Sequence, residues 1–259
     1  MTLGKGRAEA ITDDDFAVLA DSLGAHPAVL EAIANVESQG FGWFSDGRMK
    51  ILFEKHWFFK LASADVLEQA LREGLARAKW ISPGKGGYRE QRSSGQRYDI
   101  LASAIDLDEE AAYRSISMGR FQIMGFNYTA CGYQSAREMF DSFVDSEVNQ
   151  LGAFAAYLEH AKLLSALKSR DFATIEKRYN GGGLNGEYAR RMKVEYDKLR
   201  GAKWLGYVPG SNVPTTRLDR PPTSSRPEKS AGGLAGLIAR LLGVIFGAFS
   251  KKSRDGRNG

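Results

Sequence analysis

Residues 27–54, PAVLEAIANVESQGFGWFSDGRMKILFE, decide the fold of this chain because they pass from a helical pattern to a β pattern. Pro27 suits the first turn of a helix, where its missing N–H leaves no hydrogen bond unmade. Apolar residues then recur at helical spacing, at Val29, Ile33 and Val36. The first half of this stretch therefore predicts a helix that ends at the sequence Glu-Ser-Gln-Gly.

The second half of the stretch predicts a β-hairpin. The dipeptide Asp46-Gly47 favours a type I′ turn, because both of its residues tolerate positive φ angles. It separates two segments rich in apolar and aromatic residues, 42–44 and 49–53. We expect these two segments to pair as short antiparallel strands.

The rest of the chain up to residue 205 shows mainly the helical period. Thr12 followed by Asp15 predicts a helix N-terminus, and Gly24 predicts the end of that helix. Residues 83–97 are rich in glycine and basic side chains and predict a surface loop. Further helices are expected at 65–78, 109–115, 135–159, 172–179 and 187–199. The predicted fold class is mainly α (α+β), a helical domain with one small antiparallel β-hairpin.

Composition excludes several classes of protein. The 259 residues are 43% hydrophobic and 26% charged, which excludes wholesale disorder, collagen-like repeats and multi-span membrane proteins. Cys131 is the one cysteine, so no intramolecular disulfide is expected. Residues 13–15 are all aspartate, where a secretory signal would be apolar. We therefore expect a protein made in the cytoplasm without an N-terminal signal.

The positive charge is concentrated in the last fifth of the chain. Residues 206–259 hold nine basic and three acidic side chains, a net of +6, whereas the preceding residues hold 27 basic and 28 acidic side chains, a net of −1. A basic nucleic-acid groove in the main domain is therefore not expected, and no nucleic acid is predicted as a partner. Five of the seven prolines lie at 209–227, which predicts a linker at 206–230 after a domain at 1–205.

A separate C-terminal tail is expected at 231–259. Residues 231–249 are apolar or glycine apart from Arg240, and basic residues lie on both sides of them. Three interpretations stay open: an interfacial amphipathic helix, a membrane span, and a helix docked on the main domain. Placing Arg240 in the middle of a membrane span would cost about 2.5–3.5 kcal/mol. An interfacial helix is therefore at least as well supported as a span. The expected partner of the tail is an anionic membrane or outer-membrane lipid.

Two carboxylates are candidates for acid–base chemistry. Glu37 ends the predicted helix at 27–38, where the helix dipole and low solvation favour the protonated form that a general acid requires. Glu54 follows the hairpin beside the cation Lys55, which would hold it ionised, as suits a nucleophile, base or electrostatic stabiliser. Facing each other, the two carboxyl groups would suit glycoside hydrolysis. The alternatives are a solvent-exposed Glu37 and a peripheral salt bridge of Glu54.

Two further segments carry side chains able to bind sugars. Residues 117–124, SMGRFQIM, place Ser117 and Gln122 in a short apolar stretch, and the amide of glutamine can pair with a sugar amide. Tyr179 and Asn180 stand where a helix ends at three glycines. Either segment alone is equally well explained as a turn with core residues.

Metal chemistry is not expected from this sequence. The three histidines are widely spaced, and His56 is expected to pack or to hydrogen-bond rather than to bind a metal. No cofactor is therefore predicted.

Taken in order, these motifs resemble the lysozyme-like superfamily and, more closely, the N-acetylmuramidase family of phage endolysins and prophage lysozymes. The segments that carry the resemblance are Val36-Glu37-Ser38-x-Gly40, Asp46-Gly47-Arg48-x-Lys50-Ile51-Leu52-Phe53-Glu54-x-His56, Tyr98-Asp99, Ser117-x-Gly119-x-Phe121-Gln122-Ile123-Met124-Gly125-Phe126-Asn127 and Tyr179-Asn180-Gly181. The likeness covers about residues 12–200. It implies a lysozyme-like helical fold and cleavage of bacterial peptidoglycan between N-acetylmuramic acid and N-acetylglucosamine, which would lyse the cell.

The resemblance also implies roles for individual residues. Glu37 matches the family's catalytic acid, and Glu54 is the natural second carboxylate. Arg120 stands where many relatives carry an apolar residue. This difference affects the expected detail of the sugar subsite and leaves the expected fold unchanged. The residues expected to orient the sugars are Ser117, Gln122, Tyr179 and Asn180.

Two other functions stay open on the sequence. A lytic transglycosylase would use Glu37 as both acid and base, and its product would be one water lighter. A non-catalytic wall-binding protein would owe any lysis to its tail. In each case the protein would act on the cell wall, in the periplasm, after release or export.

Overall fold

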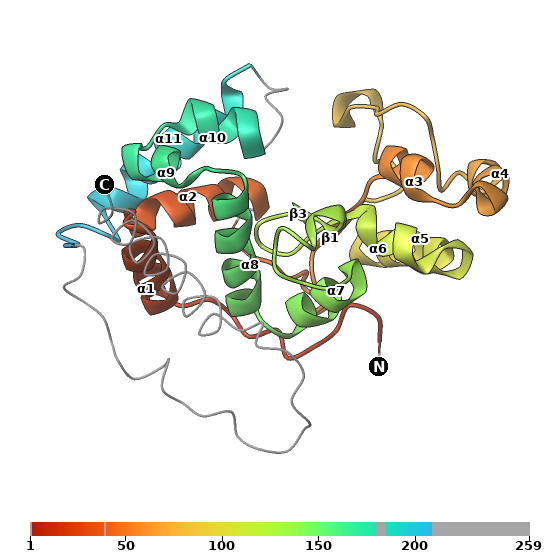
Figure 1. Cartoon of the computed structure of the whole chain (residues 1–259), viewed down its shortest axis with the longest axis horizontal. Helices are drawn as coiled ribbons and strands as arrows, with labels where there is room; N and C mark the ends of the chain where they lie inside the picture. Colours follow the sequence, from red (N-terminus) through yellow and green to blue (C-terminus); the bar gives the residue numbers. More distant parts are fainter. Residues whose placement is uncertain (1, 39, 180–184, 209–259) are drawn as a thin grey trace, which may run out of the picture.

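The computed structural model describes residues 2–38, 40–179 and 185–208 (Figure 1). This part of the chain contains eleven α-helices, three short strands and two 3₁₀ helices, so the predicted mainly α fold is confirmed. Apart from residues 206–208, the predicted linker and tail lie outside the described residues.

Secondary structure follows the chain in a mostly helical order. The α-helices are α1 (Asp13–Leu23), α2 (Pro27–Ser38), α3 (Lys55–Leu61), α4 (Ala64–Arg72), α5 (Ser94–Leu107), α6 (Glu109–Arg114), α7 (Ala136–Asp145), α8 (Glu147–His160), α9 (Leu164–Ser169), α10 (Phe172–Tyr179) and α11 (Glu187–Gly201). The strands are β1 (Ile51–Phe53), β2 (Ile116–Met118) and β3 (Ile123–Met124), and the 3₁₀ helices are η1 (Pro83–Lys85) and η2 (Gly125–Asn127).

The first two helices begin and end where their local signals predict. The hydroxyl of Thr12 accepts the N–H of Asp15, and the Asp15 carboxylate accepts the N–H of Thr12 at 2.8 Å, which completes a capping box for α1. Gly24 ends α1 with a φ of +63°, in the left-handed region that favours glycine. Pro27 begins α2, which packs between α1 and α11 (Figure 1).

The sheet is larger than the predicted hairpin. Its three strands are antiparallel in the order β1-β2-β3, with Leu52 opposite Ser117 and Ser117 opposite Met124. Between the two segments expected to pair, one isolated bridge forms, from Trp43 to Met49. Strand β1 pairs instead with β2, from a distant part of the chain, because a two-stranded hairpin alone could not bury the apolar face of β1.

Several predicted helix bounds were wrong for identifiable reasons. The helix expected at 65–78 ends at Arg72, because Gly74 turns the chain with a φ of +69°. The helix expected at 135–159 is divided at Ser146, whose hydroxyl accepts the N–H of Val148 at 3.0 Å and starts α8 as a new helix. Three helices, α3, α5 and α9, were not predicted. The start of α5 falls within the expected loop at 83–97.

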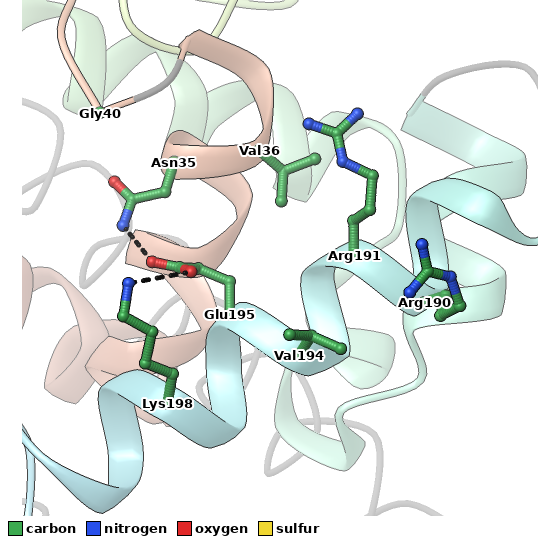
Figure 2. A pocket seen from close by; sticks show the side chains of 8 residues that line it. All are labelled: Asn35, Val36, Gly40, Arg190, Arg191, Val194, Glu195 and Lys198. Atoms are coloured by element: carbon green, nitrogen blue, oxygen red, sulfur yellow. Dashed lines mark hydrogen bonds and ion pairs between the residues drawn. The ribbon is translucent and has the colours of Figure 1, made fainter.

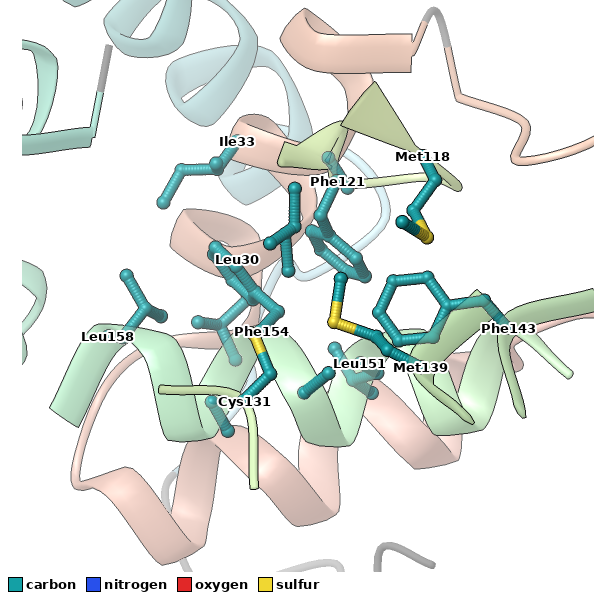
Figure 3. Packing of buried hydrophobic residues seen from close by; sticks show 14 of the residues in the cluster. Leu30, Ile33, Met118, Phe121, Cys131, Met139, Phe143, Leu151, Phe154 and Leu158 are labelled. Carbon is teal, nitrogen blue, oxygen red and sulfur yellow. The ribbon is translucent and has the colours of Figure 1, made fainter. Parts of the chain in front are cut away.

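The core forms where α2 and α8 face each other. Figure 3 shows Leu30 and Ile33 of α2 and Leu158 of α8 among the packed side chains. Phe121 stacks on Phe154 at a ring separation of 4.3 Å and an interplanar angle of 10°. The segment between β2 and β3 is thereby anchored in the core through one aromatic ring.

One buried carboxylate joins four distant parts of the chain. Glu147, at the start of α8, is 1% exposed. Its Oε1 accepts the N–H of Gly42 at 2.7 Å, and its Oε2 accepts the N–H of Ile11 at 3.1 Å. Arg120 donates to Oε2 at 3.0 Å. Arg120 therefore points into the core and pairs with Glu147, which accounts for a charged residue at this position.

We expect Glu147→Ala to lower the free energy of unfolding by about 3–5 kcal/mol, because it leaves the buried Arg120 guanidinium without its counter-ion. Urea denaturation measures this change. Glu68→Ala is the matched control, since Glu68 pairs with Arg72 on the surface of α4, and we expect a cost of about 0–1 kcal/mol. Equal costs for the two variants would show that the Arg120–Glu147 pair has no special structural role.

Candidate active site

Glu37 lies at the C-terminal end of α2, beside tyrosines from two other helices. Tyr188, in the first turn of α11, hydrogen-bonds to the Glu37 carboxylate. Burial, the Glu37 charge and this hydrogen bond raise the pKa of Tyr188 to about 12, so its phenol stays protonated and donates. Burial, and next the Glu37 charge, also raise the pKa of Tyr179, the last residue of α10. Glu37 therefore sits in a partly buried site with two phenols nearby.

A lysine connects the end of α2 to the sheet. Lys50 Nζ donates to the carbonyl of Ser38 at 2.8 Å, which satisfies a carbonyl at the negative end of the helix dipole. The carbonyl of Lys50 accepts the N–H of Gly119 at 2.8 Å. These two bonds tie the helix turn that carries Glu37 to the β2–β3 turn.

The predicted residues Ser117 and Gln122 come together on that turn. Ser117 Oγ donates to Gln122 Oε1 at 3.0 Å, and Gln122 Nε2 donates to the carbonyl of Gly119 at 2.8 Å. Gln122 has a φ of +46°, a conformation that these bonds help to maintain. Gly119 has a φ of +75°, and a Cβ there would collide with Gln150, so only glycine fits.

Tyr179 holds the same turn from the other side. Its hydroxyl donates to the carbonyl of Phe121 at 2.7 Å, and its ring packs edge-on against Phe154 and Tyr157. The Tyr179 hydroxyl is therefore already hydrogen-bonded within the protein, to the residue that precedes Gln122. Asn180, predicted as its neighbour in the sugar site, lies outside the described residues.

Glu54 extends the edge of β1. Its N–H donates to the carbonyl of Ser115 at 2.9 Å, which continues the ladder by one residue. Side chains alternate along a strand, so Glu54 follows Leu52 on the face that also carries Ser117. The opposite face is buried in the core through Ile51 and Phe53. The sheet therefore directs Glu54 and Ser117 to the same side.

A tyrosine hydroxyl and an imidazole surround the Glu54 carboxylate. The hydroxyl of Tyr88 lies 2.9 Å from both carboxylate oxygens and donates to them. Nδ1 of His56 lies 3.2 Å from Oε2, without the angle of a hydrogen bond. Burial raises the pKa of Glu54, opposed by the Tyr88 hydrogen bond and the charge of Arg77. Burial and the nearby cations lower the pKa of His56, so its imidazole is neutral at pH 7.

The expected role of Lys55 was wrong. Lys55 Nζ pairs with Glu90 at 2.6 Å. The two side chains point apart because Glu54 precedes α3 and Lys55 begins it, and successive helical residues diverge around the axis. Glu54 is thus held by a phenol, with a neutral imidazole alongside it, in place of the expected ammonium group.

Sequence reasoning missed the residues that hold the two carboxylates. Tyr88 comes from the segment expected to be a surface loop, and Tyr188 comes from the first turn of the last helix. Trp80 donates its indole N–H to the Tyr88 oxygen at 2.9 Å and remains 55% exposed. None of the three stands beside Glu37 or Glu54 in the sequence, so no local pattern could indicate these contacts.

A cavity of about 500 Å³ lies between α2 and α11, and Figure 2 shows its lining side chains. Two of its residues lie near Glu37 in the chain: Val36 directly precedes it, and Gly40 follows it by three residues. Three basic residues of α11 also line it, Arg190, Arg191 and Lys198. The cavity therefore adjoins the turn that carries Glu37 and is bordered by positive charge.

Among the described residues, no group of three or more His, Cys, Asp or Glu is arranged to hold a metal ion. No single described helix is long and apolar enough to cross a membrane, although α1 and α2 meet the criteria as a pair bent by 119°.

Comparison with known proteins identifies the family of this chain. A sequence model of the N-acetylmuramidase family matches residues 26–200, which include Glu37 and Glu54. This chain belongs to the N-acetylmuramidase family. The solved structure of an endolysin from the Burkholderia AP3 phage matches with a TM-score of 0.63 and 31% identity, over 75% of this chain and 72% of that chain. Comparison with curated proteins finds no match.

Family membership and the endolysin likeness confirm the class of enzyme. This muramidase is a glycosidase with a lysozyme-like fold, and its substrate is the peptidoglycan of the bacterial cell wall. Glu37, beside two tyrosines, and Glu54, beside a third, are therefore the candidate catalytic carboxylates of this glycosidase.

Proposed function

We propose that this muramidase hydrolyses the glycan bond between N-acetylmuramic acid and N-acetylglucosamine, with Glu37 as the general acid, and thereby causes cell lysis. The observation that carries the proposal is the position of Glu37 at the end of α2, held by the Tyr188 hydroxyl. A neutral phenol orients the carboxyl group without the strong stabilisation of the ionised form that a cation in the same place would give.

Glu37 would protonate the glycosidic oxygen as the bond to the anomeric carbon breaks. The sugar then develops oxocarbenium character, and water supplies the hydroxyl that completes the product. The proton released by water restores an acid in the site. The net reaction consumes one water molecule for each glycosidic bond that is cleaved.

Glu54 would stabilise the oxocarbenium-like centre or direct the water towards it. Either role requires an ionised carboxylate, and the Tyr88 hydrogen bond and the charge of Arg77 both favour ionisation against the opposing effect of burial. We expect the two carboxyl groups to lie within about 10 Å of each other, near 5 Å for retention and at 6.5 Å or more for inversion.

Polar residues of the β2–β3 segment, together with Tyr179 and Asn180, would shape the sugar site in two ways. Gln122 and Asn180 are proposed to contact the sugars through their amides. Ser117 and Tyr179 are proposed as positioning residues, since one hydroxyl holds Gln122 and the other holds the carbonyl of Phe121. Trp80 presents an exposed ring beside the Tyr88 that holds Glu54, which suits stacking against the apolar face of a sugar.

Mass analysis of muropeptides released from purified sacculi tests the reaction. Hydrolysis yields a reducing N-acetylmuramic acid end, whereas a transglycosylase yields an anhydro product one water lighter. A reducing N-acetylglucosamine end would place the cleaved bond elsewhere in the glycan. Sacculi left intact would favour the non-catalytic alternative.

The C-terminal tail is proposed to bind an anionic membrane or outer-membrane lipid. The support is its composition, a net charge of +6 over residues 206–259 around an apolar stretch. The protein is proposed to reach the wall by release or export. No nucleic acid is proposed as a partner.

We expect Glu37→Gln to reduce cleavage of sacculi by about 10²–10⁴-fold, because glutamine keeps the size and hydrogen bonding of glutamate but has no proton to donate to the leaving oxygen. Muropeptide release measures the rate, and circular dichroism checks the fold. Glu68→Gln, on the exposed surface of α4, is the matched control. If Glu37→Gln kept more than about a tenth of the activity, Glu37 would not be the general acid.

We expect Glu54→Gln to slow cleavage by about a hundredfold, the scale typical of losing a group that stabilises transition-state charge. The same change should maintain or raise the melting temperature at neutral pH, because glutamine still accepts the Tyr88 hydroxyl and carries no buried charge. Activity and thermal unfolding are measured on the same preparations. A lower melting temperature, with activity lost only as far as unfolding explains, would show a structural role.

The pKa shift of Glu54 also predicts how the stability difference between Glu54→Gln and the wild type changes with pH. Burial raises the pKa of Glu54 above the ordinary value near 4.5, so between the two values the folded protein binds a proton that the unfolded chain does not. The wild type therefore loses stability as pH rises from about 4.5 through the folded pKa, whereas glutamine does not titrate. The stability of Glu54→Gln relative to wild type should increase over that range.

We expect truncation after Val208 to retain cleavage of isolated sacculi and to weaken binding to anionic vesicles. The cut must follow Tyr207, because the Tyr207 hydroxyl donates to Asp21 of α1 at 2.6 Å and its ring contacts His26. Vesicle co-sedimentation measures binding, and neutral vesicles provide the control for charge. Equal binding of the full chain and the truncated chain to anionic vesicles would remove the tail from membrane recognition.

A further inference from the structure

We infer that the groove between α2 and α11 binds a carboxylate of the peptide stem carried by N-acetylmuramic acid, with Arg191 as its main contact. The inference rests on the proposed function, because it assigns a second part of the same substrate to a surface beside Glu37. It predicts that the enzyme distinguishes peptide-bearing glycan from bare glycan.

The groove has the size and location for such a group. Its volume of about 500 Å³ is within the range of small-ligand sites, and a few amino-acid residues would fill it. Val36 and Gly40 place one of its walls on the turn that carries Glu37. Figure 2 shows Arg191 projecting from α11 towards Val36. The peptide stem is joined to the muramic acid ring itself, so a stem bound here would accompany the sugar at the proposed bond.

Positive charge in the groove is only partly balanced. Glu195 is the acidic residue of the lining, and it accepts Asn35 Nδ2 at 2.9 Å and lies 3.6 Å from Lys198 Nζ. Arg190 pairs with Glu187 at 2.8 Å. Among the described residues, Arg191 forms no ion pair. A guanidinium group bordering a groove beside a catalytic site is suited to bidentate binding of a carboxylate.

The local geometry places Arg191 one ring away from the proposed acid. Its guanidinium carbon lies over the ring of Tyr188, 5.4 Å from the centroid. The hydroxyl of that tyrosine holds Glu37. A carboxylate on Arg191 would therefore be close to the reacting sugar without touching Glu37.

The experiment compares two substrates from the same sacculi: glycan strands that keep their peptide stems, and the same strands freed of peptides by an amidase. We expect the wild type to show a kcat/KM about tenfold higher on peptide-bearing strands, the factor for one charge-assisted hydrogen bond, chiefly through KM. Arg191→Gln should bring the ratio of the two kcat/KM values close to one. Lys198→Gln, at the far end of the groove from Tyr188, should lower the ratio by a smaller factor.

Lys193→Gln is the matched control, because Lys193 is an exposed basic residue of α11 that does not line the groove. It should leave the ratio unchanged. A wild-type ratio near one would overturn the inference. An equal loss by Arg191→Gln on both substrates would also overturn it, since that result is expected if Arg191 only supports Tyr188 and Glu37.

A binding measurement separates failure of this inference from failure of the proposed function. The probes are a muramyl tripeptide with free carboxylates and the same compound with its carboxylates amidated, titrated into the full-length protein by calorimetry. We expect amidation or Arg191→Gln to weaken binding about tenfold. This result would support the groove even if another glycan bond were cleaved, whereas equal binding of both probes would overturn it.

Discussion

The buried carboxylate of Glu147 is the interaction on which the site depends. It accepts hydrogen bonds from the N-terminal segment at Ile11, from Gly42 after α2, and from Arg120 between β2 and β3. Desolvating a carboxylate is costly, and the opposite charge of Arg120 together with two backbone donors offsets that cost only when all of them are present. The segment after α2 and the β2–β3 turn are therefore both bound to the carboxylate of Glu147. Lys50 adds a second connection between them, from the carbonyl of Ser38 to the N–H of Gly119. The turn that carries Glu37 and the turn that carries Gln122 consequently cannot move independently.

The two carboxylates of the site differ in how they are supported. Glu37 stands at a helix end, and helices α10 and α11 bring tyrosines to it, so its surroundings are built by packing of long elements (Figure 1). Glu54 stands at a strand end, and a segment between α4 and α5 brings Tyr88 to it. That segment is itself anchored by Gln91, whose amide exchanges two hydrogen bonds of 2.8 Å with the backbone of Phe53. A buried side-chain amide thus substitutes for a neighbouring strand at the free edge of β1 and holds the loop at the site.

Local signals in the sequence predicted the elements that depend on local chemistry. The capping box at Thr12, the proline that begins α2 and the glycine that ends α1 each act within four residues, and each prediction is confirmed. The capping box formed by Ser93 and Gln96 was an equally local signal for α5 that the loop prediction overlooked. Pairing of β1 with β2 and the contacts of Tyr88 and Tyr188 join residues far apart in the chain, and no periodicity records such contacts. Lys55 shows the opposite error, because adjacency in sequence was taken as adjacency in space.

Both carboxylates accept a hydrogen bond from a tyrosine, and the choice of partner has a chemical consequence. An arginine or lysine in the same place would favour the ionised carboxylate strongly and hold its pKa far below neutral, which would disable a general acid. A phenol whose own pKa is raised remains a neutral donor, so it orients the carboxyl group and favours its ionised form less strongly than a cation would. The cations lie one step further out, Arg77 over the ring of Tyr88 and Arg191 over the ring of Tyr188. Positive charge therefore lies one aromatic ring away from each of the two carboxylates.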